Sequence, residues 1–397
     1  MSKRVYVAYA KRTPIGKLGG SLKTVEPDDL LMPLFEDYQE QQLIPNEELD
    51  EVIIGQAKQT QDHSNIARKA LLKAGFSETL PGYTVHRACG SGMQSIHNAF
   101  MAIQSGYGNA FLVGGVESMS TAPYYVNHAR FGFLSGNVEL KDPNKASQPG
   151  SQPIEIYGEL TMGMTAENLA EKYQISREEQ DEFALNSQKK AKKAIQSDRF
   201  KDEIVPVIVP QRKKGFIVFD TDEHPRDTSL EKLAALPAVF KKDGTVTAGN
   251  SSGLNDGASL LLLVSEEIVE KYHVTPLAEV ISIGVSGVDP TIMGIGPVEA
   301  SRKALQNVGL TIDDVDLVEL NEAFAAQSIA VNRELNISDE KLNVNGGAIA
   351  LGHPIGNSGA RICVTLIHEM LKRKSRVGLA TLCVAGGQGV STVFKSV

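Results

Sequence analysis

The chain has 397 residues, of which 42% are hydrophobic and 22% are charged, a composition typical of a folded protein with one large core or two to three smaller ones. The formal net charge of -8 at pH 7 provides no overall basic field, which argues against a nucleic-acid partner but allows a small anionic ligand held by local charges. Three cysteines without a Cys-x-x-Cys spacing form neither a disulfide framework nor a zinc knuckle, so we expect a reducing compartment.

The two ends of the chain lack the common targeting patterns. The N-terminus runs directly into a strand-like pattern, and its apolar stretch is too short for a secretory signal. No segment reaches the length of a membrane-spanning helix, and the C-terminus differs from the Ser-Lys-Leu signal for peroxisomes. We therefore expect a cytoplasmic protein without a membrane partner.

In the first part of the chain, short β-branched runs alternate with longer helical patterns, which is the signature of an α/β fold. Strands are predicted at 51–55, 83–86 and 110–114. A helix is predicted after Cys89, because apolar residues recur there on one helical face and Gly106 can end it. The apolar residues of that face are Met93, Ile96, Phe100 and Ile103.

The middle of the chain, from 120 to 249, contains few runs of the buried-strand type. Residues 141–152 are rich in Pro, Ser, Asn and Gly, which indicates an excursion over the surface. The sequence Ser176-Arg-Glu-Glu179 is a capping box and predicts the start of an amphipathic helix that runs toward Arg199. We interpret this part as an inserted region.

The last part of the chain repeats the order of the first. Gly356-Asn-Ser-Gly359 opens a second predicted helix, and the predicted strand 377–383 ends in glycines. In the first part, Gly90-Ser-Gly92 opens a helix and the strand 110–114 also ends in glycines. This pattern predicts an internal duplication.

Cys89 lies between a predicted strand and a predicted helix, so its sulfur should face the positive end of the helix dipole. This position favours the thiolate, and lowering a thiol pKa from about 8.5 to about 7 increases the ionised fraction roughly tenfold. Backbone amides of the glycine turn should contribute more, since each preorganised oxyanion donor is worth ~10²–10³ in rate. The alternative is that Cys89 is a small buried hydrophobic residue at a tight turn.

Cys383 lies at the end of the last predicted strand, and the carboxyl edge of a parallel sheet is where ligands commonly bind. The glycines after it resemble a phosphate loop, but the Walker Lys and the dinucleotide fingerprint are absent. Cys363 lies in an apolar helical pattern and is predicted to belong to the core.

Two polar residues stand in unusual positions. His353 lies in the glycine-rich stretch 345–359, and so many glycines indicate that the backbone packs closely against a ligand or another segment. An imidazole in such a position can act as a base. Asn321 lies just beyond a predicted strand and can orient a water or a ligand carbonyl. An equally good local interpretation is that Asn321 caps the following helix.

Five segments in register resemble motifs of the thiolase family, and the resemblance spans the chain from Arg12-Thr-Pro-Ile-Gly16 to the last strand. In chain order the five are Cys89-Gly-Ser-Gly92, Gly249-Asn-Ser-Ser-Gly-Leu-Asn-Asp-Gly257, Asn321-Glu-Ala-Phe324, Gly352-His-Pro354 and Cys383-Val-Ala-Gly-Gly-Gln-Gly389. The resemblance implies two similar βαβαβαββ halves in a five-layered α/β core, with an inserted loop domain. We expect the N-terminal half at 1–119 and 250–270, the loop domain at 120–249 and the C-terminal half at 271–397.

The resemblance implies an acetyl-CoA C-acyltransferase that condenses or thiolytically cleaves 3-ketoacyl-CoA, including acetoacetyl-CoA. Cys89 matches the nucleophile that becomes acylated, His353 matches the residue that activates it, and Cys383 matches the acid/base cysteine. Asn321 matches the residue that holds a water and forms one oxyanion hole with the histidine. The backbone amides of Cys89 and Ala385 match the other hole. The family uses coenzyme A and acetyl-CoA as substrates and requires no metal or prosthetic group.

The resemblance also implies a coenzyme A site and a homodimer or homotetramer. Arg226 matches the residue against the adenine, but its spacing to Leu230 is one residue shorter than in the bacterial biosynthetic enzymes, so a surface arginine is the alternative. The other matching residues are Ser252 and Ala248 along the pantetheine, Phe240 and Met162 in the pocket, and Ala323 and Phe324 near the thioester.

Two residues depart from the family pattern. Ala385 stands where thiolases usually have glycine, which restricts the backbone of the oxyanion hole. Thr161 stands where acetoacetyl-specific enzymes tend to have histidine, and 162–169 and 292–297 are closer to the broad-chain 3-ketoacyl-CoA thiolases. We therefore expect a broad substrate range, with an acetoacetyl-CoA-specific acetyltransferase as the alternative.

Cys383 argues against two other enzymes of this fold, the decarboxylating ketoacyl synthases and hydroxymethylglutaryl-CoA synthase, which should carry another residue type there. A non-catalytic acyl-CoA-binding protein is the alternative from another class. Such a protein would tolerate loss of the four catalytic residues, which are all present here.

Overall fold

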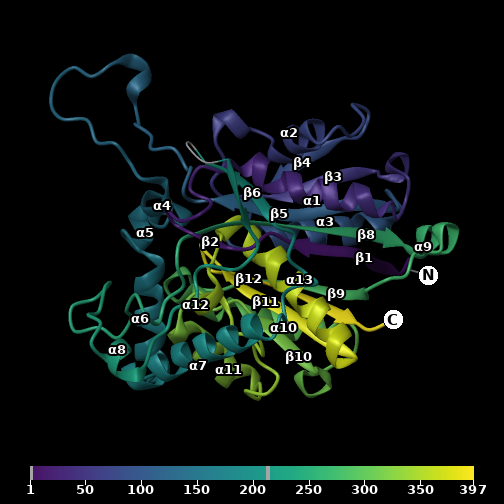
Figure 1. The fold of residues 1–397 in the computed structure, drawn as a ribbon. Helices are drawn as coiled ribbons and strands as arrows, with labels where there is room; N and C mark the ends of the chain where they lie inside the picture. The colour runs from purple at the N-terminus through teal and green to yellow at the C-terminus, as the bar shows by residue number, and fades with distance from the viewer. Residues whose placement is uncertain (1–2, 212–214) are drawn as a thin grey trace.

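The protein is a mixed α/β structure, and its computed structural model describes residues 3–211 and 215–397 (Figure 1). Within these residues, one sheet holds ten strands in the order β4-β3-β5-β8-β1-β9-β12-β11-β10, with β2 paired to β8. The strands are β1 Val5–Arg12, β2 Gly16–Lys17, β3 Glu51–Gly55, β4 Gly82–Val85, β5 Ala110–Ser118, β8 Asn255–Ser265, β9 Ala278–Gly287, β10 Leu317–Leu320, β11 Val377–Val384 and β12 Gln388–Lys395.

The sheet consists of two halves with the same plan. In the N-terminal half, β3 is parallel to β4 and to β5, and β8 lies antiparallel between β5 and β1. In the C-terminal half, β10 is parallel to β11, and β12 lies antiparallel between β11 and β9. A parallel bridge from Val318 to Leu342 takes the place of a counterpart to β4. The halves join where β1 pairs with β9, so the predicted duplication is confirmed.

Alternating side chains of each half-sheet pack into different helical layers, which gives five layers. Val52 and Ile54 of β3 face α1 (Pro27–Gln41) and α2 (Ile66–Lys73), whereas Ile53 faces the interior. The interior layer between the half-sheets contains α3 (Ser91–Ser105) and α13 (Ile355–Arg373). On the far side, α10 (Gly296–Gln306) and α11 (Ala325–Leu335) cover the C-terminal half.

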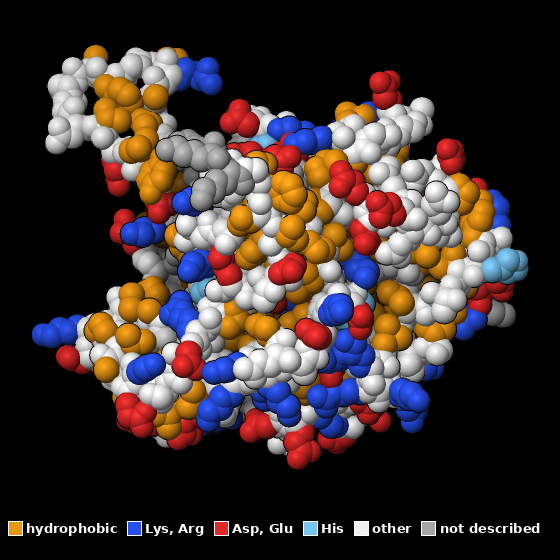
Figure 2. Space-filling view, in the orientation of Figure 1, with side chains coloured by type: hydrophobic (Ala, Val, Ile, Leu, Met, Phe, Trp, Pro, Cys, Tyr) orange, Lys and Arg blue, Asp and Glu red, His pale blue; other side chains and the backbone are white. Residues whose placement is uncertain are grey.

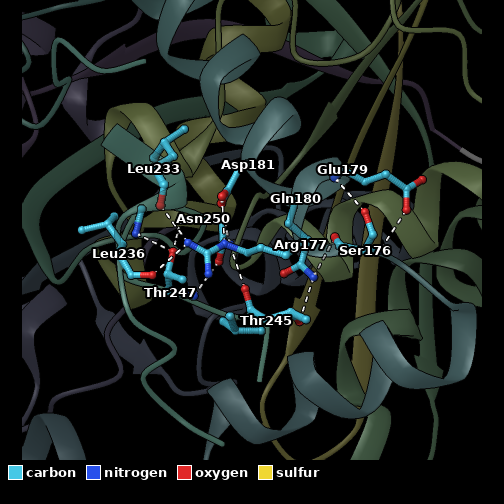
Figure 3. A network of polar contacts seen from close by, with 12 residues as sticks. Ser176, Arg177, Glu179, Gln180, Asp181, Leu233, Leu236, Thr245, Thr247 and Asn250 are labelled. Carbon is cyan, nitrogen blue, oxygen red and sulfur yellow. Dashed lines mark hydrogen bonds and ion pairs between the residues drawn. The ribbon is translucent and has the colours of Figure 1, made fainter. Parts of the chain in front are cut away.

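The chain between β5 and β8 forms a largely helical region beside the sheet (Figure 1). Its elements are α4 Pro143–Ala146, α5 Ile154–Tyr157, α6 Met162–Tyr173, α7 Arg177–Gln196, α8 Leu230–Ala234 and the paired strands β6 Val207–Pro210 and β7 Phe216–Phe219. The remaining α-helices are α9 Glu266–Tyr272 and α12 Ala348–Leu351, and short 3₁₀ segments lie at Asn46–Glu48, Gln61–His63, Ala129–Phe131, Pro149–Ser151, Pro290–Ile295 and Ile312–Asp314. The capping box at Ser176 and Glu179 is present as predicted (Figure 3).

Candidate active site

Cys89 lies in a tight turn between β4 and α3. The preceding residue, Ala88, has φ of 42°, a left-handed conformation that is uncommon for residues with a Cβ. The Ser91 hydroxyl fixes this turn, since it donates to the Ala88 carbonyl at 2.7 Å and accepts from the Arg87 amide at 2.9 Å. The turn places the Cys89 side chain at the N-terminus of α3, as the sequence predicts.

Burial raises the pKa of the Cys89 thiol above its ordinary value. The backbone amides of Ala385 and of Cys89 itself and the charge of Lys58 act in the opposite direction, while Glu117 adds to the increase. The predicted lowering of this pKa is therefore wrong, because desolvation outweighs the amides and the cation. The sulfur therefore rests as a thiol at neutral pH.

The end of β11 brings two groups to Cys89. Cys383 is fully buried, and burial together with the neighbouring Cys89 raises the pKa of its thiol. The next turn delivers the Ala385 amide to the Cys89 sulfur. Gly386 and Gly387 adopt φ of 81° and 80°, whereas Ala385 is not in the left-handed region. The Cβ of Ala385 is therefore accommodated without the backbone restriction that the sequence suggested.

His353 lies between α12 and α13 and is held on two sides. Its backbone amide donates to Oδ1 of Asn255 at 2.8 Å, and its Nδ1 lies 2.6 Å from Oγ of Ser358. Burial, with a smaller effect from Arg361, lowers the pKa of His353 to about 4. The imidazole is therefore neutral at pH 7 and able to accept a proton.

Glycines bring the segments of Cys89 and His353 together. Helices α3 and α13 pack against each other in the interior layer. A Cβ on Gly92 would lie 2.9 Å from the carbonyl oxygen of Gly356, so the first turns of the two helices are in contact. Because each candidate residue immediately precedes one of these helices, this close approach places both at one point of the fold.

Asn321 follows β10, and its backbone N–H donates to the Thr381 carbonyl of β11 at 3.0 Å. Both polar atoms of its side chain are buried and find no partner among the described residues. Helix α11 has Phe324 as its N-cap residue and no side-chain cap, so the interpretation of Asn321 as a cap is wrong. A buried amide without a partner is available for a water or a ligand oxygen.

Several residues predicted to contact coenzyme A form an apolar wall beside Cys383. The rings of Phe240 and Phe324 meet edge to face, with centroids 6.1 Å apart at an angle of 86°. A Cβ on Gly163 would overlap the Phe240 ring, so this ring has no spare room. The residues of this cluster are Met162, Phe240, Ala323, Phe324, Cys383, Ala166, Val246 and Met293.

The other three predicted contacts lie near this wall to different degrees. Ser252 is adjacent to it, because its amide donates to the Ala323 carbonyl at 3.0 Å. Ala248 is exposed on the neighbouring segment. Arg226 is exposed and lines a separate cavity of about 510 Å³ together with Lys17 and other residues. The contact of Arg226 with adenine stays a prediction.

A polar network anchors the segment that carries Ala248 and Ser252 (Figure 3). Nδ2 of Asn250 donates to Oδ1 of Asp181 at 3.0 Å, and Oδ1 of Asn250 accepts from the Thr247 amide at 2.8 Å. Helix α7, which carries Asp181, thus anchors this segment.

The sequence did not single out four residues that surround the site. Asn255 and Ser358 hold His353, and both lie within or next to the motifs, which is the signal that could have identified them. The Glu117 carboxylate accepts from the amides of Ala57, Lys58 and Gly356 at 3.1, 3.0 and 2.9 Å. For Lys58 and Glu117 the sequence contained no such signal.

Two further findings concern the described residues as a set. Over residues 3–211 and 215–397, no three or more His, Cys, Asp or Glu side chains gather in a way that would hold a metal ion. None of the helices described is both long and apolar enough to cross a membrane.

Comparison with known proteins assigns the family. Residues 5–267 match the N-terminal domain of thiolase, and residues 274–396 match its C-terminal domain. The chain belongs to the thiolase family. It is 50% identical over 393 residues to a probable acetyl-CoA acyltransferase of Staphylococcus aureus, covering 99% of both chains. It is 46% identical to the acetyl-CoA acetyltransferase of Syntrophomonas wolfei, covering 100% of both.

Solved thiolase structures share the fold over nearly the whole chain. The acetyl-CoA acetyltransferase of Bacillus anthracis superposes with a TM-score of 0.96 at 48% identity, covering 100% of this chain and 99% of that one. Human mitochondrial 3-ketoacyl-CoA thiolase gives 0.94 at 45% identity, covering 99% of both, and its complex with CoA gives 0.93 at 44%, covering 100% and 98%. The thiolase fold is confirmed, and the protein is an acyltransferase that acts on substrates bound to coenzyme A.

Proposed function

We propose that this thiolase cleaves 3-ketoacyl-CoA of varied chain length through an acyl group carried on Cys89. The observation that supports the proposal most is the arrangement at the end of β11, where the Cys383 thiol and, in the turn that follows, the Ala385 amide lie beside the Cys89 sulfur. A non-catalytic acyl-CoA-binding protein would have no use for two neighbouring thiols beside a preorganised amide.

In the first half-reaction, the Cys89 thiol gives its proton to His353 while the sulfur adds to the ketone carbon C3. The C2–C3 bond breaks, and its electron pair becomes the enolate of acetyl-CoA. The water held by Asn321, with His353, stabilises the enolate oxygen. Cys383 protonates C2, and its raised pKa keeps it in the thiol form that this step needs.

In the second half-reaction, a free coenzyme A thiol gives its proton to the Cys383 thiolate and attacks the acyl group on Cys89. The amides of Cys89 and Ala385 stabilise the tetrahedral oxyanion. When the Cys89 sulfur leaves, the proton on His353 returns to it, so both thiols regain their starting state. Condensation runs through the same steps in reverse.

A broad acyl range is supported by Thr161. Its side chain accepts from the Met164 amide at 3.3 Å and caps α6, a structural role that a histidine would fill differently. Specificity for acetoacetyl-CoA is the alternative. The structural neighbours include an acetyl-CoA acetyltransferase and a 3-ketoacyl-CoA thiolase at similar identity, so the proposal depends on the motifs of this chain.

The deciding experiment is thiolysis of acetoacetyl-CoA and of 3-ketohexadecanoyl-CoA by the purified protein beside Cys89→Ala. We expect cleavage of both, followed as loss of the 3-ketoacyl-CoA absorbance, and none by the variant. Cleavage of acetoacetyl-CoA alone would support the acetoacetyl-specific alternative. Activity that survives in Cys89→Ala would reject the acyl-cysteine mechanism.

We also propose a homo-oligomer in the cytoplasm. Residues 121–141 leave the body as an arm, visible at the upper left of Figure 1, whose apolar side chains are exposed (Figure 2). The exposed fraction of Phe131 is 94% and that of Leu134 is 105%. Exposed apolar patches of this kind mark interfaces, and a second copy of the chain is the occupant we propose.

A further inference from the structure

Lys58 is a buried cation without an ion-pair partner. It is 8% exposed, and its Nζ donates to the Pro143 carbonyl at 2.9 Å and to the Ser147 hydroxyl. Over the part of the chain that the structure describes, no carboxylate lies within ion-pair distance of this ammonium, and burial lowers the pKa of Lys58 against the opposing charges of Glu117, Cys89 and Asp142. A buried charge with only neutral acceptors is costly, so its retention at this point calls for an anion that it serves.

The fold places Lys58 next to Cys89. Strands β3 and β4 are parallel, with Gly55 opposite Val85. Lys58 follows the first of these strands by three residues and Cys89 follows the second by four, so both leave the same carboxyl edge of the sheet. The charge of Lys58 acts on the Cys89 thiol, and that of the Cys89 thiolate acts in turn on Lys58.

The other charged groups around Lys58 and Cys89 are occupied or have the wrong sign. Glu117 of β5 accepts from three backbone amides, and burial raises its pKa to about 7. Asp142, before α4, is a further carboxylate near Lys58. His86 is uncharged at neutral pH, because burial and Lys58 lower its pKa. Lys58 is thus the cationic side chain that acts on the Cys89 sulfur.

We propose that Lys58 is a positioning residue whose ammonium stabilises the negative charge on the Cys89 sulfur as its proton leaves for His353. The inference rests on the proposed role of Cys89 as the nucleophile. Burial makes the anionic sulfur expensive to form, and a fixed cation in a water-poor site offsets that cost more strongly than one in solvent. Lys58 therefore adds a positive charge to the partial charge of the α3 N-terminus, which alone does not offset the cost of forming the Cys89 thiolate.

The contacts of Lys58 also fix the position of its charge. Pro143 and Ser147 belong to the segment around α4, which continues to Gln148. Oε1 of Gln148 accepts from the Met162 amide at 3.1 Å, and Met162 belongs to the apolar wall beside Cys383. The segment that holds the cation is thus the one that leads into the predicted coenzyme A pocket.

The test is the pH dependence of Cys89 alkylation by iodoacetamide, a neutral reagent, counted by mass spectrometry. Cys89→Ala gives the background from the buried Cys363 and Cys383. We expect Lys58→Met to move the midpoint of the alkylation profile up by about one pKa unit and to slow alkylation at pH 7.5 about tenfold. Lys58→Arg, which keeps the charge, should keep the midpoint near that of the wild type.

Two controls separate charge from anchoring. Lys145→Met removes an exposed lysine from α4 and should leave the profile unchanged. Lys58→Gln keeps a donor for Pro143 and Ser147 without the charge and should reproduce the shift, and it carries the test if the Met variant does not fold. A midpoint that stays in place in the neutral variants, even with altered activity or acyl selectivity, would overturn the inference.

The outcome for the wild type tells this inference from the proposed function. If the wild type cleaves 3-ketoacyl-CoA but the alkylation midpoint does not move in Lys58→Met or Lys58→Gln, the inference alone is rejected. A wild-type protein that neither cleaves these substrates nor alkylates at Cys89 rejects the nucleophile and, with it, the role of Lys58.

Discussion

The Oγ atom of Ser358 lies 2.6 Å from Nδ1 of His353 and 3.0 Å from the carbonyl oxygen of Pro354. A hydroxyl has one proton and a carbonyl only accepts, so the Ser358 proton is directed to Pro354 and its lone pair accepts from Nδ1–H of His353. The ring is thereby fixed in the tautomer that leaves Nε2 free to take a proton.

Ser358→Ala should lower kcat about tenfold or more with little change in KM, because general acid–base catalysis is worth ~10²–10⁴ and depends on the correct tautomer. Steady-state thiolysis of acetoacetyl-CoA measures both constants. Ser95→Ala is the matched control, since it removes a buried hydroxyl bonded to the Gly92 and Gly114 carbonyls. An equal loss of kcat in both variants would contradict the tautomer argument.

Asn321→Ala should separate activity from stability. It removes two buried polar atoms that have no partner among the described residues, so the melting temperature should stay the same or rise. Loss of the oxyanion water should lower kcat by ~10²–10³. Asn343→Ala provides the contrast, because its side chain bonds both backbone groups of Leu320 and should destabilise the protein. A parallel loss of stability in Asn321→Ala would show that its role is structural.

Gly163→Ala should weaken coenzyme A binding more than it slows chemistry. The added Cβ displaces the Phe240 ring, which in turn meets Phe324 edge to face. We expect KM for coenzyme A to rise about tenfold, equivalent to about 1.4 kcal/mol, with kcat changed less. Gly150→Ala, with open space around the new methyl, is the control. A kcat effect without a KM effect would place Phe240 outside the binding pocket.

His97 should make stability depend on pH. Burial lowers its pKa to about 3, below the unfolded value of 6.5, so the unfolded chain binds more protons between these limits. Stability is then lost as pH falls through this window, by about 1.4 kcal/mol per pH unit and about 2 kcal/mol by pH 5. Urea unfolding of the wild type and His97→Gln isolates this effect. A constant difference between them from pH 7.5 to 5 would refute it.

The arm should determine the assembly state. Phe131→Asp with Leu134→Asp puts charge where the proposed interface is apolar, so the molar mass by light scattering should fall by at least half. Asn137→Asp adds a charge to the same exposed arm without removing an apolar side chain and should leave the mass unchanged. An unchanged mass in the double variant would place the interface elsewhere.

The sequence predicts the alternating elements, the duplication and the position of Cys89 at a helix N-terminus, because each depends on local pattern. It does not predict the direction of the Cys89 pKa shift, since that is a balance in which burial opposes Lys58, a residue that lies beyond the end of a different strand, β3. Asn321 shows the same limit. From the sequence alone, Asn321 fits a helix cap and a water-binding amide equally well, because the choice depends on which residue begins α11.

The family motifs identify the candidate residues but not what holds them. Ser91 fixes the turn before α3, and Ser358 fixes the ring of His353, in both cases through hydrogen bonds that depend on exact backbone geometry. The adenine contact of Arg226 stays a prediction, because this exposed side chain lines a cavity separate from the apolar wall beside Cys383.

The position of β8 has a consequence for synthesis on the ribosome. Strand β1 is made first, yet over the described residues its strand partners are β8 and β9, which begin at Asn255 and Ala278, apart from one bridge between Arg12 and Ile204. Until residue 255 has emerged, most of β1 has no strand partner and β5 presents an open edge, while closing so long a loop adds entropic cost and slows folding. Nascent chains that stall within residues 119–254 should therefore be prone to aggregation through these unpaired strands and dependent on chaperones.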